Sequence, residues 1–175
     1  MTKSVIAAVL MAASVWGGSL AFESGTIKAH TEVFGDSSID PVFRKAHSKL
    51  SMGDDPQSLR GSIEVTVTDF VSDNKKRDEH MYEAMASDKF PKASFEVKEV
   101  VAKGGDGYLL KGTMNLHGVS KPMSFEGNIA EEGNTVRIKA KSVMKMSDFG
   151  IEPPKMLFLT VRDQVDLSVD VVLKR

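Results

Sequence analysis

The sequence contains no cysteine at all. This absence excludes disulfide bonds, thiol nucleophiles, iron–sulfur clusters and cysteine-based zinc sites. The chain also carries almost no net charge, because 23 Lys and Arg residues are balanced by 24 Asp and Glu residues. Nucleic-acid-binding domains usually carry a clustered basic face, so we expect no nucleic-acid partner.

Motifs of catalysis and metal binding are missing as well. The four histidines form no HxH, HxxxH or HExxH pattern, so no metal site is expected; they are His30, His47, His80 and His117. No serine lies in a GxSxG motif, and no glycine-rich phosphate loop occurs. We therefore expect no enzyme activity, no catalytic residue and no cofactor.

A long apolar run occurs only near the N-terminus. Residues 5–15 are apolar, follow Lys3, and precede the small-x-small sequence of residues 19–21. This order is typical of a secretory signal peptide, and the run is short for a membrane span. We expect a signal peptide at residues 1–21, cleavage after Ala21, and a periplasmic domain at residues 22–175. An uncleaved anchor is the alternative.

Alternation of apolar and polar residues dominates the remainder of the chain. Such a pattern predicts strands with one buried and one solvent-facing side. The clear segments are residues 63–68, 110–117, 123–129, 136–144 and 165–173, and the weaker ones are residues 27–33, 46–52 and 95–97. Short connections with turn residues favour antiparallel neighbours. About eight such strands can form either a sandwich or a closed barrel, and the alternation alone does not choose.

Residues 73–86 break this alternation and predict a helix. The segment lacks Gly, Pro and β-branched residues, and Asp73 is expected to cap its N-terminus. The polar cluster at residues 77–80 lies on this helix. Its side chains are expected to tie the helix to nearby loops or to contact a ligand head group. A His80–Asp78 acid–base pair ranks last, since positions two apart on a helix do not face each other.

Two further features concern the interior. Methionine is abundant, with 10 residues, and thioether side chains adapt well to flexible apolar ligands, although they also fill cores. Small residues at the inward positions Gly112, Gly127 and Ala140 favour an unfilled interior. The apolar, proline-broken segment 146–159 is expected to be a loop over one mouth, a plug or a protein-contact patch.

Four stretches resemble the YceI-like family, in the family's order and with similar spacing. They are SDNKKRDEHM at residues 72–81, SDKFPKASF at 87–95, GTMNLHGVSKP at 112–122 and SDFGI at 147–151. The resemblance implies an all-β fold, namely an eight-stranded antiparallel lipocalin-like barrel with one short helix after the third strand. It also implies a periplasmic address and an apolar pocket for a polyisoprenoid chain. Residues 22–52 depart from the family's usual opening pattern, as in a divergent branch.

The first functional hypothesis is a periplasmic carrier of a polyisoprenoid, a quinone or a similar apolar amphiphile held in the barrel. The candidate wall residues are Val65, Val67, Phe95, Val97, Leu110, Met114, Leu116, Met123, Phe125, Met144 and Phe149. Arg77, His80 and Lys155 are the candidate head-group contacts. The expected partners are this lipid-like ligand and, transiently, the membrane or a periplasmic protein; a dimer is compatible with the sequence.

The second hypothesis is a periplasmic protein-interaction module with a filled barrel. Apolar loop residues 149–159 would then form its contact surface. A small hydrolase or isomerase ranks third, because the sequence shows no nucleophile or metal motif.

Overall fold

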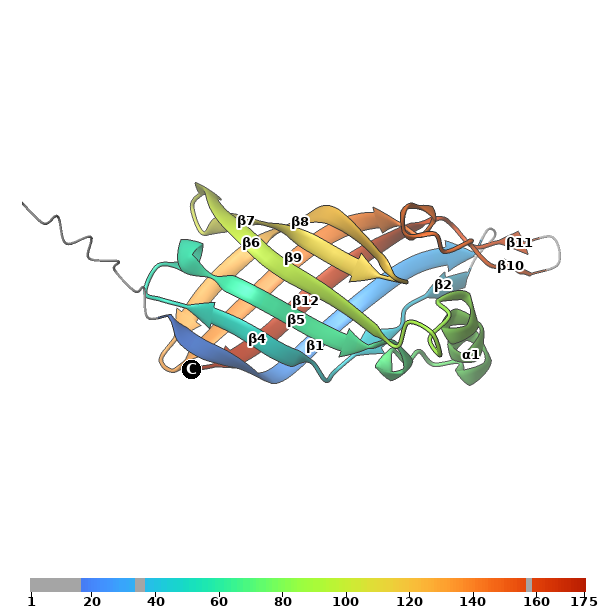
Figure 1. Cartoon of the computed structure of the whole chain (residues 1–175), viewed down its shortest axis with the longest axis horizontal. Coiled ribbons are helices and arrows are strands. Elements are labelled where there is room, and N and C mark those ends of the chain that lie inside the picture. The colour runs from blue at the N-terminus through green and yellow to red at the C-terminus, as the bar shows by residue number, and fades with distance from the viewer. Residues whose placement is uncertain (1–16, 34–36, 157–158) are drawn as a thin grey trace, which may run out of the picture.

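The protein is an elongated antiparallel β-barrel with one short helix at one end (Figure 1). The computed structural model describes residues 17–33, 37–156 and 159–175, and most of the expected signal peptide lies outside these ranges. The strands are β1 (Gly18–Val33), β2 (Ser37–Ile39), β3 (Val42–Phe43), β4 (His47–Met52), β5 (Arg60–Thr66), β6 (Lys92–Gly104), β7 (Gly107–Leu116), β8 (Val119–Glu132), β9 (Thr135–Lys145), β10 (Lys155–Met156), β11 (Leu159–Thr160) and β12 (Gln164–Lys174). The helices are α1 (Lys75–Ala84) and the 3-10 turns η1 (Pro56–Ser58), η2 (Val67–Asp69) and η3 (Ser147–Phe149).

Eight of these strands close into the barrel. The order is β12-β9-β8-β7-β6-β5-β4-β1, and β1 pairs again with β12 along residues 21–30. Closure leaves none of these strands as a free edge. The predicted lipocalin-like barrel with a helix after its third strand is therefore confirmed.

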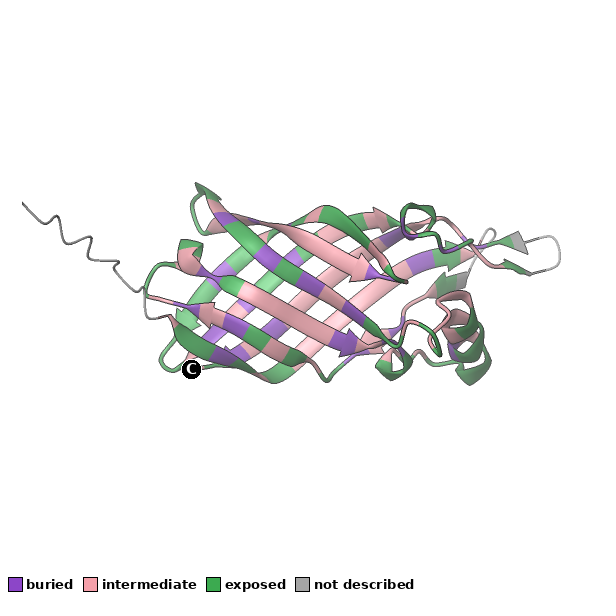
Figure 2. Ribbon diagram, in the orientation of Figure 1, coloured by how far each residue is buried: buried purple, intermediate pink, exposed green. Residues whose placement is uncertain are grey.

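Burial alternates clearly along β6 and the first half of β9, as the sequence pattern predicts (Figure 2). On β6, Ala93, Phe95 and Val97 are buried whereas Glu96 and Lys98 are exposed. A register shift between residues 97 and 99 then inserts one extra residue. This bulge returns Val100, rather than residue 99, to the interior.

Two local expectations are wrong. The strand expected to continue to residue 68 ends at Thr66, because Val67 turns into η2, where its N–H donates to the Pro91 carbonyl at 2.8 Å. The helix cap is Asn74 instead of Asp73. The Asn74 side chain accepts hydrogen bonds from the N–H groups of Lys76 and Arg77 at 3.1 and 3.2 Å.

Strand β1 extends further toward the N-terminus than the expected domain boundary. Residues 18–20 pair with the end of β4, and Leu20 is only 1% exposed in the core. The expected cleavage point after Ala21 thus falls inside β1. None of the described helices is long and apolar enough to cross a lipid bilayer.

Candidate functional site

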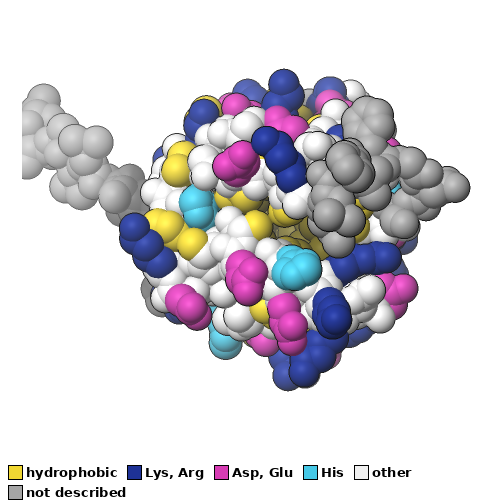
Figure 3. All heavy atoms as spheres, turned by 90° about the vertical axis from the view of Figure 1, so that its right-hand side faces the viewer, with side chains coloured by type: hydrophobic (Ala, Val, Ile, Leu, Met, Phe, Trp, Pro, Cys, Tyr) yellow, Lys and Arg dark blue, Asp and Glu magenta, His cyan; other side chains and the backbone are white. Residues whose placement is uncertain are grey.

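A cavity of about 620 Å³ extends into the barrel from the end nearest α1, and its lining runs along β12 from Val165 to Val171. Figure 3 looks at this end of the molecule and shows a hollow with hydrophobic side chains inside and charged and histidine side chains around it. The volume lies within the usual range for small-molecule sites, roughly 300–1,000 Å³. A site of this shape suits an elongated apolar ligand that enters from one end.

Most of the predicted wall residues line this cavity. They are Val65, Phe95, Val97, Leu110, Met114, Leu116, Phe125 and Met144. Their shared inward face follows from strand alternation, and Phe95 and Phe125 additionally meet edge to face, with ring centroids 4.9 Å apart. The geometry brings these side chains together, and their role in binding stays a prediction.

Three predicted wall residues lie outside the cavity wall. Val67 is buried in η2, because the chain leaves the sheet before reaching it. Phe149 is buried in a second core cluster beneath η3, where its carbonyl oxygen lies 3.0 Å from His117 Nδ1. Met123 is half-buried and packs against the main core cluster instead.

Sequence reasoning missed a large part of the wall. The inward residues of β1 and β12 contribute Ile27, Ala29, Thr31, Val165, Leu167, Val169 and Val171. Met81 and Ala84 of helix α1, and Met85 at its C-cap, also line the cavity. The alternation in residues 27–33 and 165–173 carries the signal for the strand residues, since it marks the same inward face. Nothing in it shows that these two strands are neighbours.

The Thr31 side chain on the cavity wall is hydrogen-bonded to the wall itself. Its hydroxyl lies 3.0 and 2.9 Å from the carbonyl oxygens of Arg162 and Gln164. Within the part of the chain that the structure describes, no buried side-chain polar atom lacks a partner. The interior therefore suits an apolar chain, because it has few free hydrogen-bonding groups for a polar ligand.

All three predicted head-group residues lie at the rim of the cavity. Arg77 and His80 come from α1, and Lys155 comes from the start of β10. Two carboxylates, Glu83 and Glu152, line the same rim, and the Lys155 Nζ lies 3.7 Å from Glu152. Positive and negative groups are thus mixed at the mouth. Such a rim can hydrogen-bond to a polar head group without concentrating charge of one sign.

Helix α1 is tied to the segment that precedes it by a buried carboxylate. Asp78 is 7% exposed, and its oxygens accept hydrogen bonds from the Ser72 N–H at 3.0 and 3.1 Å and from the Ser72 hydroxyl at 2.7 Å. The Tyr82 hydroxyl donates to the Phe70 carbonyl at 2.6 Å, and burial, together with the negative charges of Asp78 and Asp69, raises the Tyr82 pKa. Asp78 therefore positions the helix that carries Arg77 and His80.

Replacing Asp78 with alanine is expected to destabilise the protein by about 2 kcal/mol, because hydrogen bonds to a charged group are lost and the Ser72 N–H is left without its acceptor. Thermal unfolding followed by circular dichroism measures the effect. The matched control is Asp73→Ala, whose side chain is 92% exposed and should change stability by less than about 0.5 kcal/mol. Equal effects of the two changes would contradict this role of Asp78.

A second polar cluster joins the outer side of β1 to the segment after β2. Asp40 lies 2.9 Å from Lys28 Nζ and 2.7 Å from His30 Nδ1. Burial acts to raise the Asp40 pKa, but the hydrogen bonds of Lys28, His30 and Ser38 outweigh it and hold the pKa at about 2. The hydrogen bond to Asp40 is the main reason why the His30 pKa is raised.

These shifts predict a pH window for stability. The Asp40 contribution is present above its ordinary pKa of 3.8 and is lost as the pH falls toward about 2. The His30 contribution is full below its ordinary pKa of 6.5 and is lost as the pH rises through its raised value. The stability advantage of the natural protein over Asp40→Asn should therefore be greatest between about pH 4 and pH 6.5. Melting temperatures across pH, with Asp54→Asn as the control, test this; a constant difference across the range would contradict it.

No metal centre accompanies the cavity in the described residues, where no three His, Cys, Asp or Glu side chains gather in a way that could hold an ion.

Curated proteins of other bacteria are similar to this chain in sequence. A UPF0312 protein of Pseudomonas putida (strain W619) is 27% identical over 128 residues, which cover 69% of this chain and 66% of the relative. A UPF0312 protein of Yersinia pestis (strain Pestoides F) is 30% identical over 104 residues, which cover 55% of this chain and 54% of the relative. The chain thus matches between about half and two thirds of the length of these curated relatives.

Solved structures show the same fold. Burkholderia cenocepacia BcnA superposes with a TM-score of 0.75 at 17% identity, covering 85% of this chain and 95% of BcnA. A mutant YCEI protein of Campylobacter jejuni gives a TM-score of 0.69 at 17% identity, covering 81% and 88% of the two chains. The YceI-like domain family matches residues 19–173, which is nearly the whole barrel. The chain belongs to the YceI-like family.

Proposed function

We propose that the protein binds the apolar chain of an isoprenoid-type amphiphile, such as a polyisoprenoid or a quinone, inside the barrel and carries out no chemistry on it. The observation that carries this proposal is the cavity of about 620 Å³, whose interior is apolar apart from the hydrogen-bonded Thr31 and whose rim carries charged groups of both signs. Family membership supports it, because the YceI-like barrel is the fold of polyisoprenoid-binding proteins.

Burial of the chain would supply the binding free energy. About 300 Å² of apolar ligand surface removed from water is worth roughly 7 kcal/mol, at about 25 cal/mol per Å², before the cost of ordering the ligand. Arg77, His80 and Lys155 would orient the head group at the mouth. Since Glu83 and Glu152 share this rim, the arrangement favours a neutral polar head over a multiply charged anion.

The hollow interior of the barrel argues against the filled-barrel interaction module. That alternative needs an interior occupied by the protein's own side chains, whereas the cavity leaves much of the interior open. The interaction-module hypothesis places the contact surface at residues 149–159. Of these, Ile151, Pro154 and Lys155 line the cavity. Residues 157–158 lie outside the described part of the chain.

A periplasmic site of action is part of the proposal, and it rests on the N-terminal sequence. Export through residues 1–21 would place the barrel where lipids must cross an aqueous layer. The mass of the exported chain tests both the address and the cleavage point. A chain that begins at Phe22 would lack Leu20, a buried core residue, so the mass also tells how much of β1 is retained.

Native mass spectrometry of the protein purified from its own host tests the binding function. We expect an additional mass of a few hundred daltons that organic solvent removes and that lipid extracts restore. The same measurement on protein refolded without lipid is the control. A bare polypeptide mass from the host, together with no uptake of any isoprenoid or quinone by the refolded protein, would overturn the proposal.

A further inference from the structure

The cavity ends on a layer of fully packed side chains near the end of the barrel opposite α1. This layer, called the floor here, consists of Leu20, Met52, Val100, Ile129, Val136 and Leu173. All six are buried, with exposed fractions between 0 and 6%, and none of them lines the cavity. The floor lies toward the end of the barrel where the C-terminus is found (Figure 1).

Six different strands contribute side chains to the floor. On β9 the wall residues Ile138 and Ala140 are followed, two positions toward the floor, by Val136. On β12 the wall residue Val171 is followed by Leu173, which pairs with Val136. On three other strands a wall residue is also followed, toward the floor, by a floor residue. These pairs are Leu50 and Met52 on β4, Val97 and Val100 on β6, and Phe125 and Ile129 on β8, while β1 contributes Leu20.

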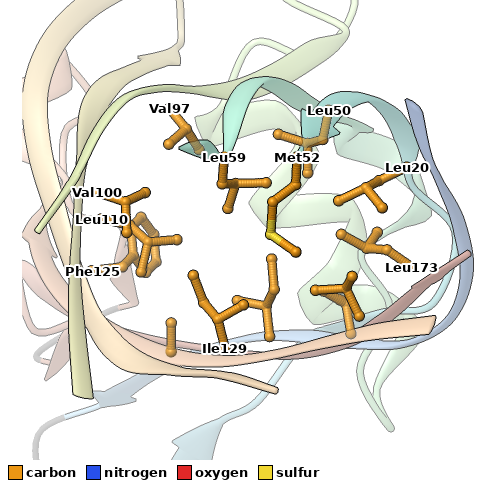
Figure 4. Close-up of a cluster of buried hydrophobic side chains, with 14 of the residues drawn as sticks. Leu20, Leu50, Met52, Leu59, Val97, Val100, Leu110, Phe125, Ile129 and Leu173 are labelled. Carbon is orange, nitrogen blue, oxygen red and sulfur yellow. The ribbon is translucent and has the colours of Figure 1, made fainter. Parts of the chain in front are cut away.

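Met52 occupies the centre of this floor. Figure 4 shows its unbranched side chain extending from β4 into the middle of the ring, between Leu20 and Leu173 on one side and Leu59 on the other. Its exposed fraction is 0%. The remaining floor residues are aliphatic and approach from the surrounding strands. Met52 is therefore the side chain whose shortening opens the floor along the barrel axis.

The volume of the cavity above the floor limits the length of the ligand chain that the barrel can enclose. A cavity of about 620 Å³, at about 30 Å³ per small non-hydrogen group, has room for about 20 such groups. A longer chain would have to leave its remaining carbons at the mouth, where they gain little from burial.

We propose that Met52 and the floor around it set the length of apolar chain that the barrel encloses, so that ligands with tails of about 20 carbons or fewer are bound completely and longer tails gain no affinity. This inference rests on the proposed function, because it defines the ligand class of the same cavity. Shortening a floor side chain should then allow a longer ligand chain to be enclosed. Enlarging a wall side chain above the floor should have the opposite effect.

Displacement of the fluorescent probe N-phenyl-1-naphthylamine by an even-numbered series of saturated primary alcohols, from decanol to octacosanol, measures the limit. The affinity for the alcohol should rise with each added pair of carbons up to a certain chain length and not beyond it. This chain length is called the stopping point here. Met52→Ala removes three side-chain atoms beyond Cβ, so the stopping point should move to chains about three carbons longer. Ala140→Leu adds three atoms to the wall above the floor and should move it to shorter chains by a similar number.

Matched variants separate chain length from general loss of packing. Met52→Leu nearly keeps the side-chain volume and should leave the stopping point unchanged. Phe43→Leu also removes three atoms from a buried residue, 1% exposed, but that residue lies outside the cavity wall, so the stopping point should stay. If Met52→Ala fails to fold, Ala140→Leu still tests the inference in the opposite direction.

The two proposals fail in different ways. If neither the probe nor any alcohol binds the natural protein, the proposed function is overturned. If the alcohols bind but affinity keeps rising beyond about 20 carbons, or the stopping point is the same in Met52→Ala, Ala140→Leu and the natural protein, the floor does not set chain length and this inference alone is overturned.

Discussion

Replacing Gly61 with alanine is expected to destabilise the barrel by about 4 kcal/mol, which would lower the melting temperature by about 12 °C in a domain of this size. Gly61 lies on β5 with a φ of +109°, a conformation that residues with a Cβ rarely adopt. A Cβ at this position would also lie 2.1 Å from the Lys49 carbonyl oxygen and 3.0 Å from the Lys49 carbonyl carbon. Both atoms belong to the backbone of β4, so the neighbouring strand itself would have to move.

Two other glycines separate the causes of this loss. Gly104 has a φ of +92° but open space around the position of its Cβ, so Gly104→Ala should show the backbone strain alone, about 1–2 kcal/mol. Gly18 has open space and no positive φ, so Gly18→Ala should leave stability nearly unchanged. Chemical denaturation of the three variants gives the comparison. Should Gly61→Ala unfold no more easily than Gly104→Ala, β4 and β5 do not approach each other so closely.

The sequence predicts the strands and their inward faces well because this signal is local, whereas the choice of a barrel over a sandwich follows from the resemblance to the YceI-like family. Alternation at Phe95 and Val97, and again at Leu110, Met114 and Leu116, marks which side chains face inward, and these residues do line the cavity. Closure between β1 and β12 is a contact between the two ends of the domain, and alternation carries no information about it. The wall residues of these strands, such as Ala29 and Leu167, were missed for this reason.

Other wrong expectations also arise from contacts between distant parts of the chain, which alternation does not show. Thr66, Val67 and Thr68 continue the apolar–polar pattern of β5, yet the chain leaves the sheet at Val67, because the Val67 N–H is bonded to the Pro91 carbonyl. Residues 18–20 suit the end of a signal peptide and also suit a strand, and only the pairing with β4 shows that they belong to β1. The depth of the cavity depends on which inward side chains meet across the barrel, as Met52 does with its neighbours in the floor.

Filling the cavity from β12 should weaken binding about 50-fold without unfolding the protein. The change is the pair Leu167→Phe and Val169→Phe, two inward residues of the wall. Their strand neighbours include the small residues Ala29 and Ser142 beside Leu167 and Ala140 beside Val169. Together the two rings add seven side-chain atoms, which take up about a third of the room for about 20 atoms.

The expected size of this effect follows from the lost burial. A third of about 300 Å² of ligand surface, at about 25 cal/mol per Å², corresponds to about 2.5 kcal/mol. Because the new rings enter open space, the cost of overpacking, about 1–3 kcal/mol in a filled core, should be largely absent and the melting temperature should fall little. Displacement of N-phenyl-1-naphthylamine by hexadecanol measures the binding, and circular dichroism measures the melting temperature.

Ser168→Phe provides the matched control, because it places the same ring one residue away on the same strand. Successive side chains of a strand point to opposite faces, and Ser168 is not part of the cavity wall. Its ring should therefore lie on the outer surface and leave binding unchanged. Equal binding by the double variant and the natural protein would mean that the ligand does not enter the barrel past β12. Weakened binding in Ser168→Phe as well would mean that the outer surface, and not the interior, holds the chain.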